Sequence, residues 1–236
     1  MLTAKVSDSI AKELTKFCKA NPERVRIRQS VNDGSKFSAC SEDSGVEAVI
    51  CPAQTKKVNN CGDCSLCMFA TKPVMFLGHG RVAHSETSKN YVKNGTTIFQ
   101  NNIQNVCDVP DHISILKDGN DKTGNEIIKG RWKGYKILCL TLTERKTCPP
   151  CIHYNDCYGN NMFCTVRYKT DGLMDRLAID IAKLNPKKKC AIRLHILGDF
   201  WSVEYVQFWQ KILDTYPNIR IFGFTAHKIN NDHIVR

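Results

Sequence analysis

The alternation of strands and helices in the second half of the chain is the feature that most constrains the fold. Apolar, β-prone runs predict three buried strands, at residues 136–142, 190–197 and 219–226. Two helices are predicted between them, one over residues 170–184 and one that begins after a Ser202 cap and runs to Tyr216. Strands that alternate with helices form parallel sheets joined by crossovers. We therefore expect an α/β fold, a partial or complete parallel β/α barrel.

The first part of the chain contains fewer predicted elements. Residues 5–20 have the apolar spacing of an amphipathic helix, and residues 24–30 alternate as a half-buried strand does. The charged positions of that strand are Arg24, Arg26 and Arg28, which either line a pocket or face water, and we favour water. Short strands are predicted at residues 46–50 and 73–77.

Residues 81–133 differ from both flanking regions. They are rich in Asn, Lys, Gly, Asp, Ser and Thr and show no sustained period, which is typical of a linker or an irregular excursion. This segment separates residues 1–80 from residues 134–236. A chain of 236 residues is long enough for one large core, and we expect the three parts to form one structural domain.

Charge and composition limit the kinds of partner that this chain is expected to bind and the compartment in which it is expected to lie. The formal net charge of +11 indicates attraction to a polyanion, with nucleic acid as the first candidate, although the lysines are spread along the chain. No apolar run of about 18 residues exists, so no membrane span is expected. The first eight residues lack an apolar signal core, which favours a cytoplasmic, reducing location.

Thirteen cysteines, an odd number, favour metal binding over a disulfide framework. Three of them, Cys148, Cys151 and Cys157, fall in a Pro- and Gly-framed loop directly after the strand at 136–142, where open α/β sheets place reactive groups. Thiolates at this spacing suit a soft metal or an iron–sulfur cluster. Cys164 is a fallback fourth ligand, and His153 ligates the metal or donates a hydrogen bond to a sulfur.

A second group of thiols lies earlier in the chain. Two overlapping C-x-x-C units with one more cysteine upstream form a strong metal motif, made by Cys51, Cys61, Cys64 and Cys67. The spacing fits tetrahedral Zn²⁺ and a [4Fe–4S] cluster equally well, because both need four thiolates on tight turns. His79, beside two glycines, is a fallback ligand.

Polar residues follow the other strands of the predicted sheet. Gly198 and Asp199 come after the second strand and His227 after the third, so these loops and the cysteine loop should meet at one mouth. Asp199 is expected either to bind a substrate amine or ribose hydroxyl or act as a base, or simply to cap the next helix. Gly198 is a candidate cofactor-binding position. His195 is expected to be a satisfied core histidine.

Several of these motifs resemble the phage gene product 88 family. The resemblance covers most of residues 24–80 and 131–227, and its motifs are Cys51-Pro52-Ala53-Gln54, Cys61 to Cys67, Cys148-Pro149 to Cys157-Tyr158-Gly159, Leu197-Gly198-Asp199-Phe200 and Phe222-Gly223-Phe224-Thr225-Ala226. The family has no settled biochemical function. The resemblance implies a phage-encoded protein in the cytoplasm of a host cell.

The order of these motifs departs from the family pattern. In the family the Cys-Pro-Ala-Gln and C-x-x-C-x-x-C part follows the Phe-Gly-Phe-Thr-Ala strand, whereas here it comes first. The chain therefore resembles a circular permutant, in which the helix at 5–20 and the strand at 24–30 are the next β/α unit after residues 229–236. This arrangement predicts that Met1 and Arg236 are neighbours. A gene joined at the wrong point would produce the same order.

A weaker likeness is to radical-AdoMet enzymes, which also carry a cysteine loop after the first barrel strand. Their C-x3-C-x2-C signature differs from the x2 and x5 spacing of Cys148, Cys151 and Cys157. A [4Fe–4S] cluster on three thiolates would leave one iron open for a substrate or AdoMet. The sequence thus allows three functions: an iron–sulfur enzyme acting on a nucleic acid or nucleotide, a non-catalytic zinc protein that binds nucleic acid, or an accessory protein that binds another protein.

Overall fold

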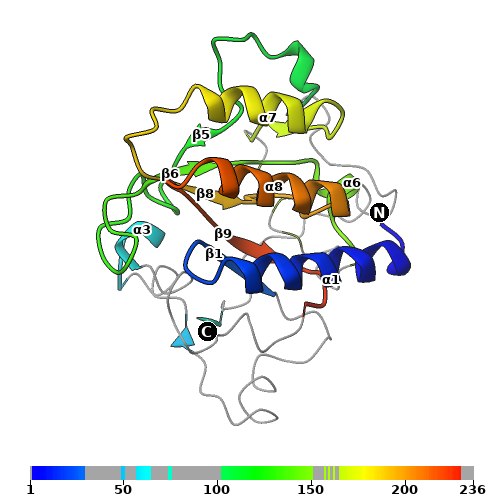
Figure 1. Cartoon of the computed structure of the whole chain (residues 1–236), viewed down its shortest axis with the longest axis horizontal. Helices are drawn as coiled ribbons and strands as arrows, with labels where there is room; N and C mark the ends of the chain where they lie inside the picture. The colour runs from blue at the N-terminus through cyan, green and yellow to red at the C-terminus, as the bar shows by residue number, and fades with distance from the viewer. Residues whose placement is uncertain are drawn as a thin grey trace.

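A five-stranded sheet is the centre of the computed structural model of this protein (Figure 1). Its strand order is β1-β9-β8-β6-β5, and the strands are β1 (Val25–Gln29), β9 (Ile219–Thr225), β8 (Cys190–Leu194), β6 (Lys136–Cys139) and β5 (Lys117–Asp118). The first four are parallel, and β5 is antiparallel to β6. The structure describes residues 2–29, 49–50, 57–64, 74–75, 102–150, 157, 159, 162 and 165–229.

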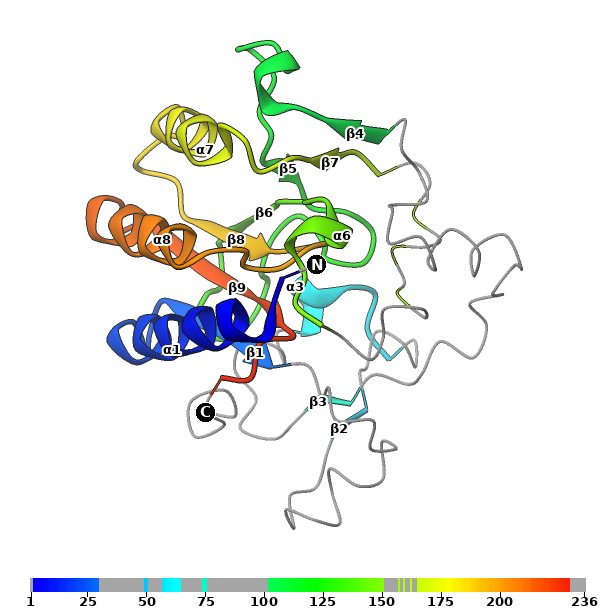
Figure 2. The ribbon, with the colours of Figure 1, turned by 90° about the vertical axis from the view of Figure 1, so that its right-hand side faces the viewer.

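Three helices cover one face of this sheet (Figure 2). They are α1 (Ala4–Ala20), α8 (Val203–Thr215) and α7 (Leu173–Ala182), and α8 packs between the other two. The larger apolar core fills the layer between helices and sheet, with fully buried side chains such as Leu14, Ile192 and Trp209. A smaller core contains Trp132 and Phe222. Its strand residues alternate along the strands with those of the larger core.

The predicted α/β class is confirmed, as are the main elements. Helix α1 begins after a Thr3 cap and ends at Asn21, and its Ile10, Leu14 and Phe17 are buried as the spacing predicts. Strand β1 pairs in parallel with β9, so α1 and β1 do follow β9 as the next β/α unit in space. This adjacency is a long-range one, because β1 lies near the beginning of the sequence and β9 near the end of the described chain.

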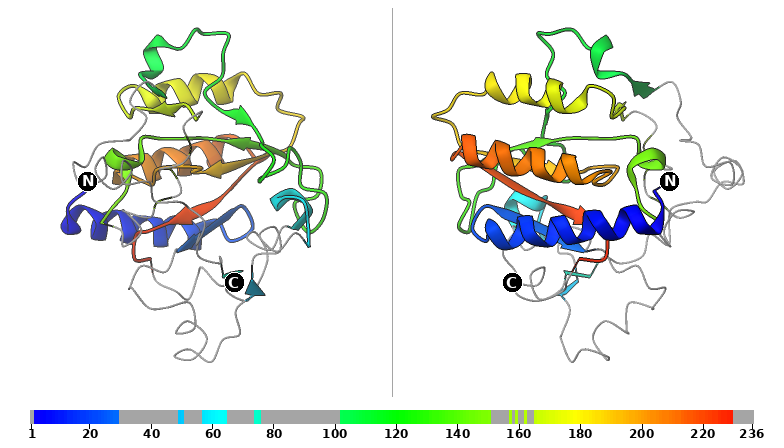
Figure 3. Two further views of the ribbon diagram at one scale, coloured as in Figure 1. Left: turned by 180° about the vertical axis from the view of Figure 1, so that it is seen from behind. Right: turned by 45° about the vertical axis from the view of Figure 1, so that its right-hand side comes forward.

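The remaining elements are short (Figure 3). They are β2 (Val49–Ile50), α3 (Cys61–Cys64), β3 (Val74–Met75), β4 (Ile103–Gln104), η2 (Val106–Asp108), α6 (Glu144–Thr147) and β7 (Arg167–Tyr168). Strands β2 and β3, at the positions predicted for two short strands, pair in parallel with each other. Strand β4 pairs with β7, and Leu142 bridges to Tyr168 beyond the end of β6.

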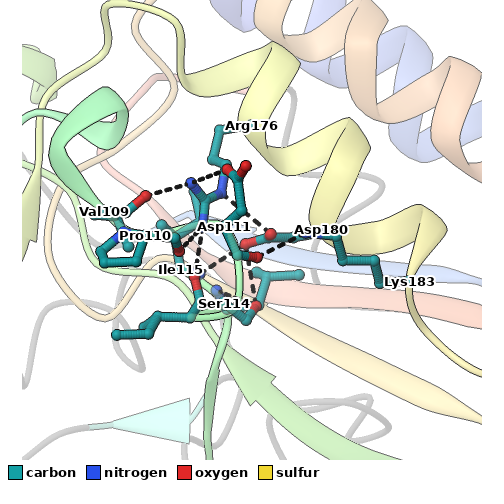
Figure 4. Close-up of polar contacts among 10 residues, drawn as sticks. Val109, Pro110, Asp111, Ser114, Ile115, Arg176, Asp180 and Lys183 are labelled. Carbon is teal, nitrogen blue, oxygen red and sulfur yellow. Dashed lines mark hydrogen bonds and ion pairs between the residues drawn. The ribbon is translucent and has the colours of Figure 1, made fainter.

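Residues 102–133 are irregular but packed. The guanidinium of Arg176 on α7 donates hydrogen bonds to the carbonyl oxygens of Val109 (2.7 Å) and Pro110 (2.9 Å), and the carboxylate of Asp180 accepts one from the backbone N–H of Ile115 (2.7 Å), as Figure 4 shows. The segment also supplies core residues, since Ile115 is fully buried. Its polar composition gave no sign of this docking onto α7.

Two expectations about exposure are wrong. Arg28 was expected to face water but is 7% exposed, and Arg24 directs its guanidinium to the carbonyl oxygens of Leu213 (2.7 Å) and Tyr216 (2.6 Å) at the end of α8. The acceptors at a helix carboxyl end are attractive to a cation, which explains the position of Arg24. Val6, which shares the apolar spacing of the buried face of α1, is 42% exposed. Among the described residues, no helix combines the length and apolarity that crossing a bilayer requires.

Candidate functional site

The loops that follow β6, β8 and β9 meet around the carboxylate of Asp199. One carboxylate oxygen accepts hydrogen bonds from the backbone N–H of Phe200 and the hydroxyl of Thr225, both at 2.8 Å. The other accepts the backbone N–H of Ala226 at 2.7 Å, and the N–H of Asp199 itself donates to Thr147 Oγ1 at 3.2 Å. Asp199 is therefore a buried link between all three loops, and the predicted convergence is found for these residues.

Burial raises the pKa of Asp199, while the nearby imidazole of His227 and the three hydrogen-bond donors act in the opposite direction. The capping alternative for Asp199 does not hold, because Ser202 caps α8 by accepting the N–H of Tyr205 at 3.1 Å. Ser202 was the predicted cap, and that prediction is confirmed. Whether Asp199 also contacts a substrate or acts as a base stays a prediction.

His227 extends the link to the first helix of the chain. Its Nε2 lies 2.7 Å from the carbonyl oxygen of Phe200, which can only accept, so Nε2 carries the proton. Nδ1 makes the second hydrogen bond of the ring, with the hydroxyl of Ser7 at 2.8 Å. His227 is fully buried, and its Nε2 is 3.9 Å from Asp199 Oδ1. The beginning of α1 is thus bound to the loop after β9.

Gly198 is required by close packing. Its φ of +87° lies in the left-handed region, and a Cβ there would be 2.7 Å from both Leu142 Cβ and Thr147 Oγ1. The backbone of the β8 loop therefore lies directly against the segment that leads into the cysteine loop. A cofactor-binding role for Gly198 stays a prediction, and its packing role is evident.

The cysteine loop after β6 is held by a buried ion pair. Arg167, which is fully buried, donates from Nε to Glu144 Oε2 at 3.0 Å, and Glu144 is 4% exposed. The same guanidinium donates to the carbonyl oxygens of Gly159 (2.9 Å), Met162 (3.1 Å) and Thr165 (2.8 Å). Arg167, a single side chain on β7, therefore fixes the carboxyl-terminal part of the loop against α6, where the loop begins.

Cys148 and Cys157 lie at the two ends of this arrangement. The N–H of Cys148 donates to the carbonyl oxygen of Glu144 at 3.0 Å, which closes α6. A Cβ on Gly159 would be 2.9 Å from Leu197 Cδ2 and 3.4 Å from Cys157 Sγ, so Cys157 lies near the β8 loop. Both cysteines are partly exposed. Thiols at this depth are more accessible to a metal than a core cysteine is.

The second group of thiols begins on α3, a single helical turn with Cys61 and Cys64 at its ends. The N–H groups of Cys61 and Gly62 donate to the carbonyl oxygens of Lys122 (2.8 Å) and Thr123 (2.9 Å). A Cβ on Gly62 would overlap the carbonyl of Glu126, so only glycine fits there. Both cysteines are partly exposed, and their turn is bound firmly to residues 122–126.

The other predicted ligands lie outside the described residues. They are Cys51, Cys67, Cys151, Cys164, His79 and His153, and the same holds for the predicted contact between Met1 and Arg236. Within the described ranges, no three His, Cys, Asp or Glu side chains lie close enough together to hold a metal ion. Only two thiols of each proposed ligand set lie within the described residues, and the structure therefore does not test the metal sites. The metal assignment stays a prediction.

His195 is buried in the core, as predicted, but the expectation that its polar atoms are satisfied holds only for Nε2, because the buried Nδ1 has no hydrogen-bond partner within the described part of the chain. It is 3% exposed, its Nε2 is 3.0 Å from the hydroxyl of Tyr205 on α8, and its ring lies edge-on to Phe200 with centroids 5.1 Å apart. Burial lowers the pKa of His195 to about 3. Tyr205 and Trp209 are fully buried on α8.

Sequence reasoning missed the residues that position the site. Glu144 and Arg167 are 23 positions apart, and Ser7 and His227 are 220 apart. Neither pair has a spacing that any motif would signal. The sequence held one local hint. Arg167 and Glu144 are charged residues within otherwise β-prone or loop-forming segments, and a charge that becomes buried there requires a partner.

Comparisons with known proteins add no relatives: no family model, curated protein or solved structure matches this chain.

Proposed function

We propose that this chain is a metalloprotein of the kind suggested by its resemblance to the phage gene product 88 family. In this proposal Cys148, Cys151 and Cys157 bind an iron–sulfur cluster at the carboxyl end of β6. A second thiolate site, for a cluster or Zn²⁺, is made by Cys51, Cys61, Cys64 and Cys67. We further propose a partial β/α barrel in circularly permuted order, supported by the place of α1 and β1 beside β9.

The position of Cys148 and Cys157 is the observation that supports the proposed metal site. Both are partly exposed thiols on a loop that Arg167 and Glu144 fix from within, next to the point where Asp199 links three strand ends. A cluster needs thiolates on a backbone that does not rearrange, and the contacts of Arg167 with Glu144 and Gly159 support this part of the proposal. The donor chemistry therefore fits an iron–sulfur cluster or another soft metal.

The residues around the loop have separate roles in this proposal. The cluster supplies an open iron, when bound by three thiolates, for a substrate or AdoMet. Arg167 holds the loop in shape, and Gly198 permits the close approach of the β8 loop. Asp199 holds the loops after the three strands together through hydrogen bonds with Thr147, Thr225 and Ala226. A nucleic acid or nucleotide is the proposed substrate class, which rests on the net charge of +11.

The first test is metal analysis with electron paramagnetic resonance on protein purified without oxygen. We expect a brown protein with iron and acid-labile sulfide. Cys151→Ser should lose metal from the loop site and Cys64→Ser from the other, each leaving the second site loaded. Cys107→Ser, at an exposed cysteine outside both sets, is the control and should keep all metal. Unchanged metal content in both site variants would overturn the assignment.

A zinc protein is the alternative, and the α3 turn gives the specific reason. The backbone N–H groups of Cys61 and Gly62 donate to the carbonyl oxygens of Lys122 and Thr123, so a metal that fixed this turn would also stabilise its contact with a distant segment. A colourless protein with stoichiometric zinc at both sites would favour this alternative. Removal of that zinc by a chelator should then lower thermal stability without any loss of a redox signal.

A further inference from the structure

The amino ends of the four parallel strands carry a row of cations. These ends lie at the edge opposite to α6 and the cysteine loop, on the left in Figure 1. One basic residue stands at or just before each strand, and we call these four the basic row: Lys136, Lys189, Arg220 and Arg24. The backbone holds them together, since the N–H of Lys136 donates to the carbonyl oxygen of Lys189 and that of Ile221 to Arg24, both at 2.9 Å. With strands about 4.8 Å apart, the row spans about 14 Å.

Tyr135 concentrates charge at the centre of the row. The ammonium of Lys189 lies 5.7 Å and the guanidinium of Arg220 lies 5.3 Å from the centre of its ring. An aromatic face attracts both cations, so it holds two like charges near one another. Burial lowers the pKa of Arg24, and Arg220 lowers it further, as expected when cations crowd together.

Acidic side chains compensate only part of this charge. Lys136 pairs with Asp118 at 2.7 Å, and Arg131 next to the row pairs with Glu23 at 3.1 Å. Asp214 favours the charged form of Arg24. The remaining cations have no acidic side-chain partner among the residues that the structure describes, and they are Lys187, Lys188, Lys189 and Arg220. The three lysines are exposed on the turn between α7 and β8.

We propose that this edge binds the phosphate backbone of a nucleic acid through Lys187, Lys188, Lys189 and Arg220. Arg24 and Lys136 complete the row of cations but direct their charged groups to the carbonyl oxygens at the end of α8 and to Asp118. A linear series of cations matches a linear series of phosphates better than it matches a single anion. The cations come from turns and strand ends whose backbone is fixed by the sheet, so little backbone entropy is lost on binding. This surface lies at the opposite end of the strands from the cysteine mouth, and its binding does not depend on the proposed metal sites.

The test compares two triple variants that remove the same charge. Lys187→Gln, Lys188→Gln and Lys189→Gln neutralise the α7–β8 turn, and Lys5→Gln, Lys12→Gln and Lys19→Gln neutralise three exposed lysines of α1. Fluorescence anisotropy with labelled single-stranded and duplex oligonucleotides of mixed sequence gives the affinity over a series of salt concentrations. Circular dichroism and metal content check that each variant is folded and loaded as the unsubstituted protein is.

The turn variant should bind about a hundredfold more weakly near 0.1 M salt, with a salt slope smaller by about 2 to 3, because each lost phosphate contact removes about 0.7 to 0.9. The α1 variant should lose far less. Equal losses in both variants would overturn the proposal, since net charge alone would then explain binding. No oligonucleotide binding by the unsubstituted protein, or binding to anionic phosphatidylserine vesicles alone, would overturn it too. Metal-depleted protein should bind as the loaded protein does, so loss of the metal assignment leaves this result intact.

Discussion

The imidazole of His195 is buried against Phe200 and Tyr205, and burial lowers its pKa to about 3 from an ordinary value of 6.5. The folded state therefore keeps it neutral where the unfolded chain would bind a proton. Its contribution to stability is complete above about pH 6.5 and is lost as the pH falls toward 3. The loss from this one group reaches about 1.4 kcal/mol per pH unit within that window.

We therefore predict that His195→Gln flattens the dependence of the free energy of unfolding on pH between about 6.5 and 3. Glutamine can still hydrogen-bond the Tyr205 hydroxyl but cannot take up a proton. His112→Gln, at an exposed histidine, is the matched control and should leave the slope as it is. The measurement is urea unfolding at a series of pH values, and identical slopes in all three proteins would contradict the prediction.

Individual residues of the site also show what the sequence alone could not predict. Asp199 was singled out because it follows a glycine at a strand end, and it does lie at the meeting point of three loops. Its partners Thr147, Thr225 and Ala226 come from two other strand ends, and no local pattern identifies them. Arg28 was misplaced for the same reason, because strand alternation gives the face of a side chain and not what covers that face.

At the scale of elements, the cysteine loop depends on one buried pair. We predict that Arg167→Met lowers the free energy of unfolding by about 3 to 5 kcal/mol, because it leaves the Glu144 carboxylate buried without its partner. The carbonyl oxygens of Gly159 and Thr165 also lose their donor. Denaturant unfolding measures the change, and metal content after mild purification reports on the loop.

Two further variants make this prediction specific. Arg167→Met combined with Glu144→Leu should recover part of the stability, since no buried charge is then left uncompensated. Lys16→Met breaks the exposed pair with Glu13 and should cost less than about 1 kcal/mol. A similar small cost for Arg167→Met would show that the loop is held by something else.

The elements that sequence predicted well are those with a strong period. Helices α1, α7 and α8 each bury one apolar stripe, and strands β8 and β9 are mostly apolar and mostly buried, so local pattern and tertiary burial agree. Residues 102–133 show the opposite case. Their position is set by Arg176 and Asp180 on α7, two residues far along the chain, and not by their own pattern.

At the scale of the whole molecule, the join between the two ends of the described chain can be tested directly. The Ser7–His227 contact of 2.8 Å and the pairing of β1 with β9 hold the first helix and the last strand together. We predict that a chain with Arg236 fused to Met1, and opened between Asn94 and Gly95, folds with a thermal midpoint within a few degrees of the original.

The control for this rearrangement keeps the same fusion but opens the chain between Ile192 and Arg193. That cut lies in β8, in the middle of the sheet, where pairing with both β6 and β9 would be interrupted. We expect no cooperative thermal transition from it. A rearranged chain opened at Asn94 that also fails to unfold cooperatively would contradict the permuted arrangement.

The pairing of β1 with β9 also has a consequence for how the protein is made. The neighbour that strand β1 needs is translated about 190 residues after it, which takes roughly 10 to 40 seconds at ordinary elongation rates. During that interval Ile10, Leu14 and Phe17 of α1 have no sheet to cover them. The nascent chain therefore carries an uncovered apolar stripe until β9 is made, and holding chaperones would be expected to engage it there.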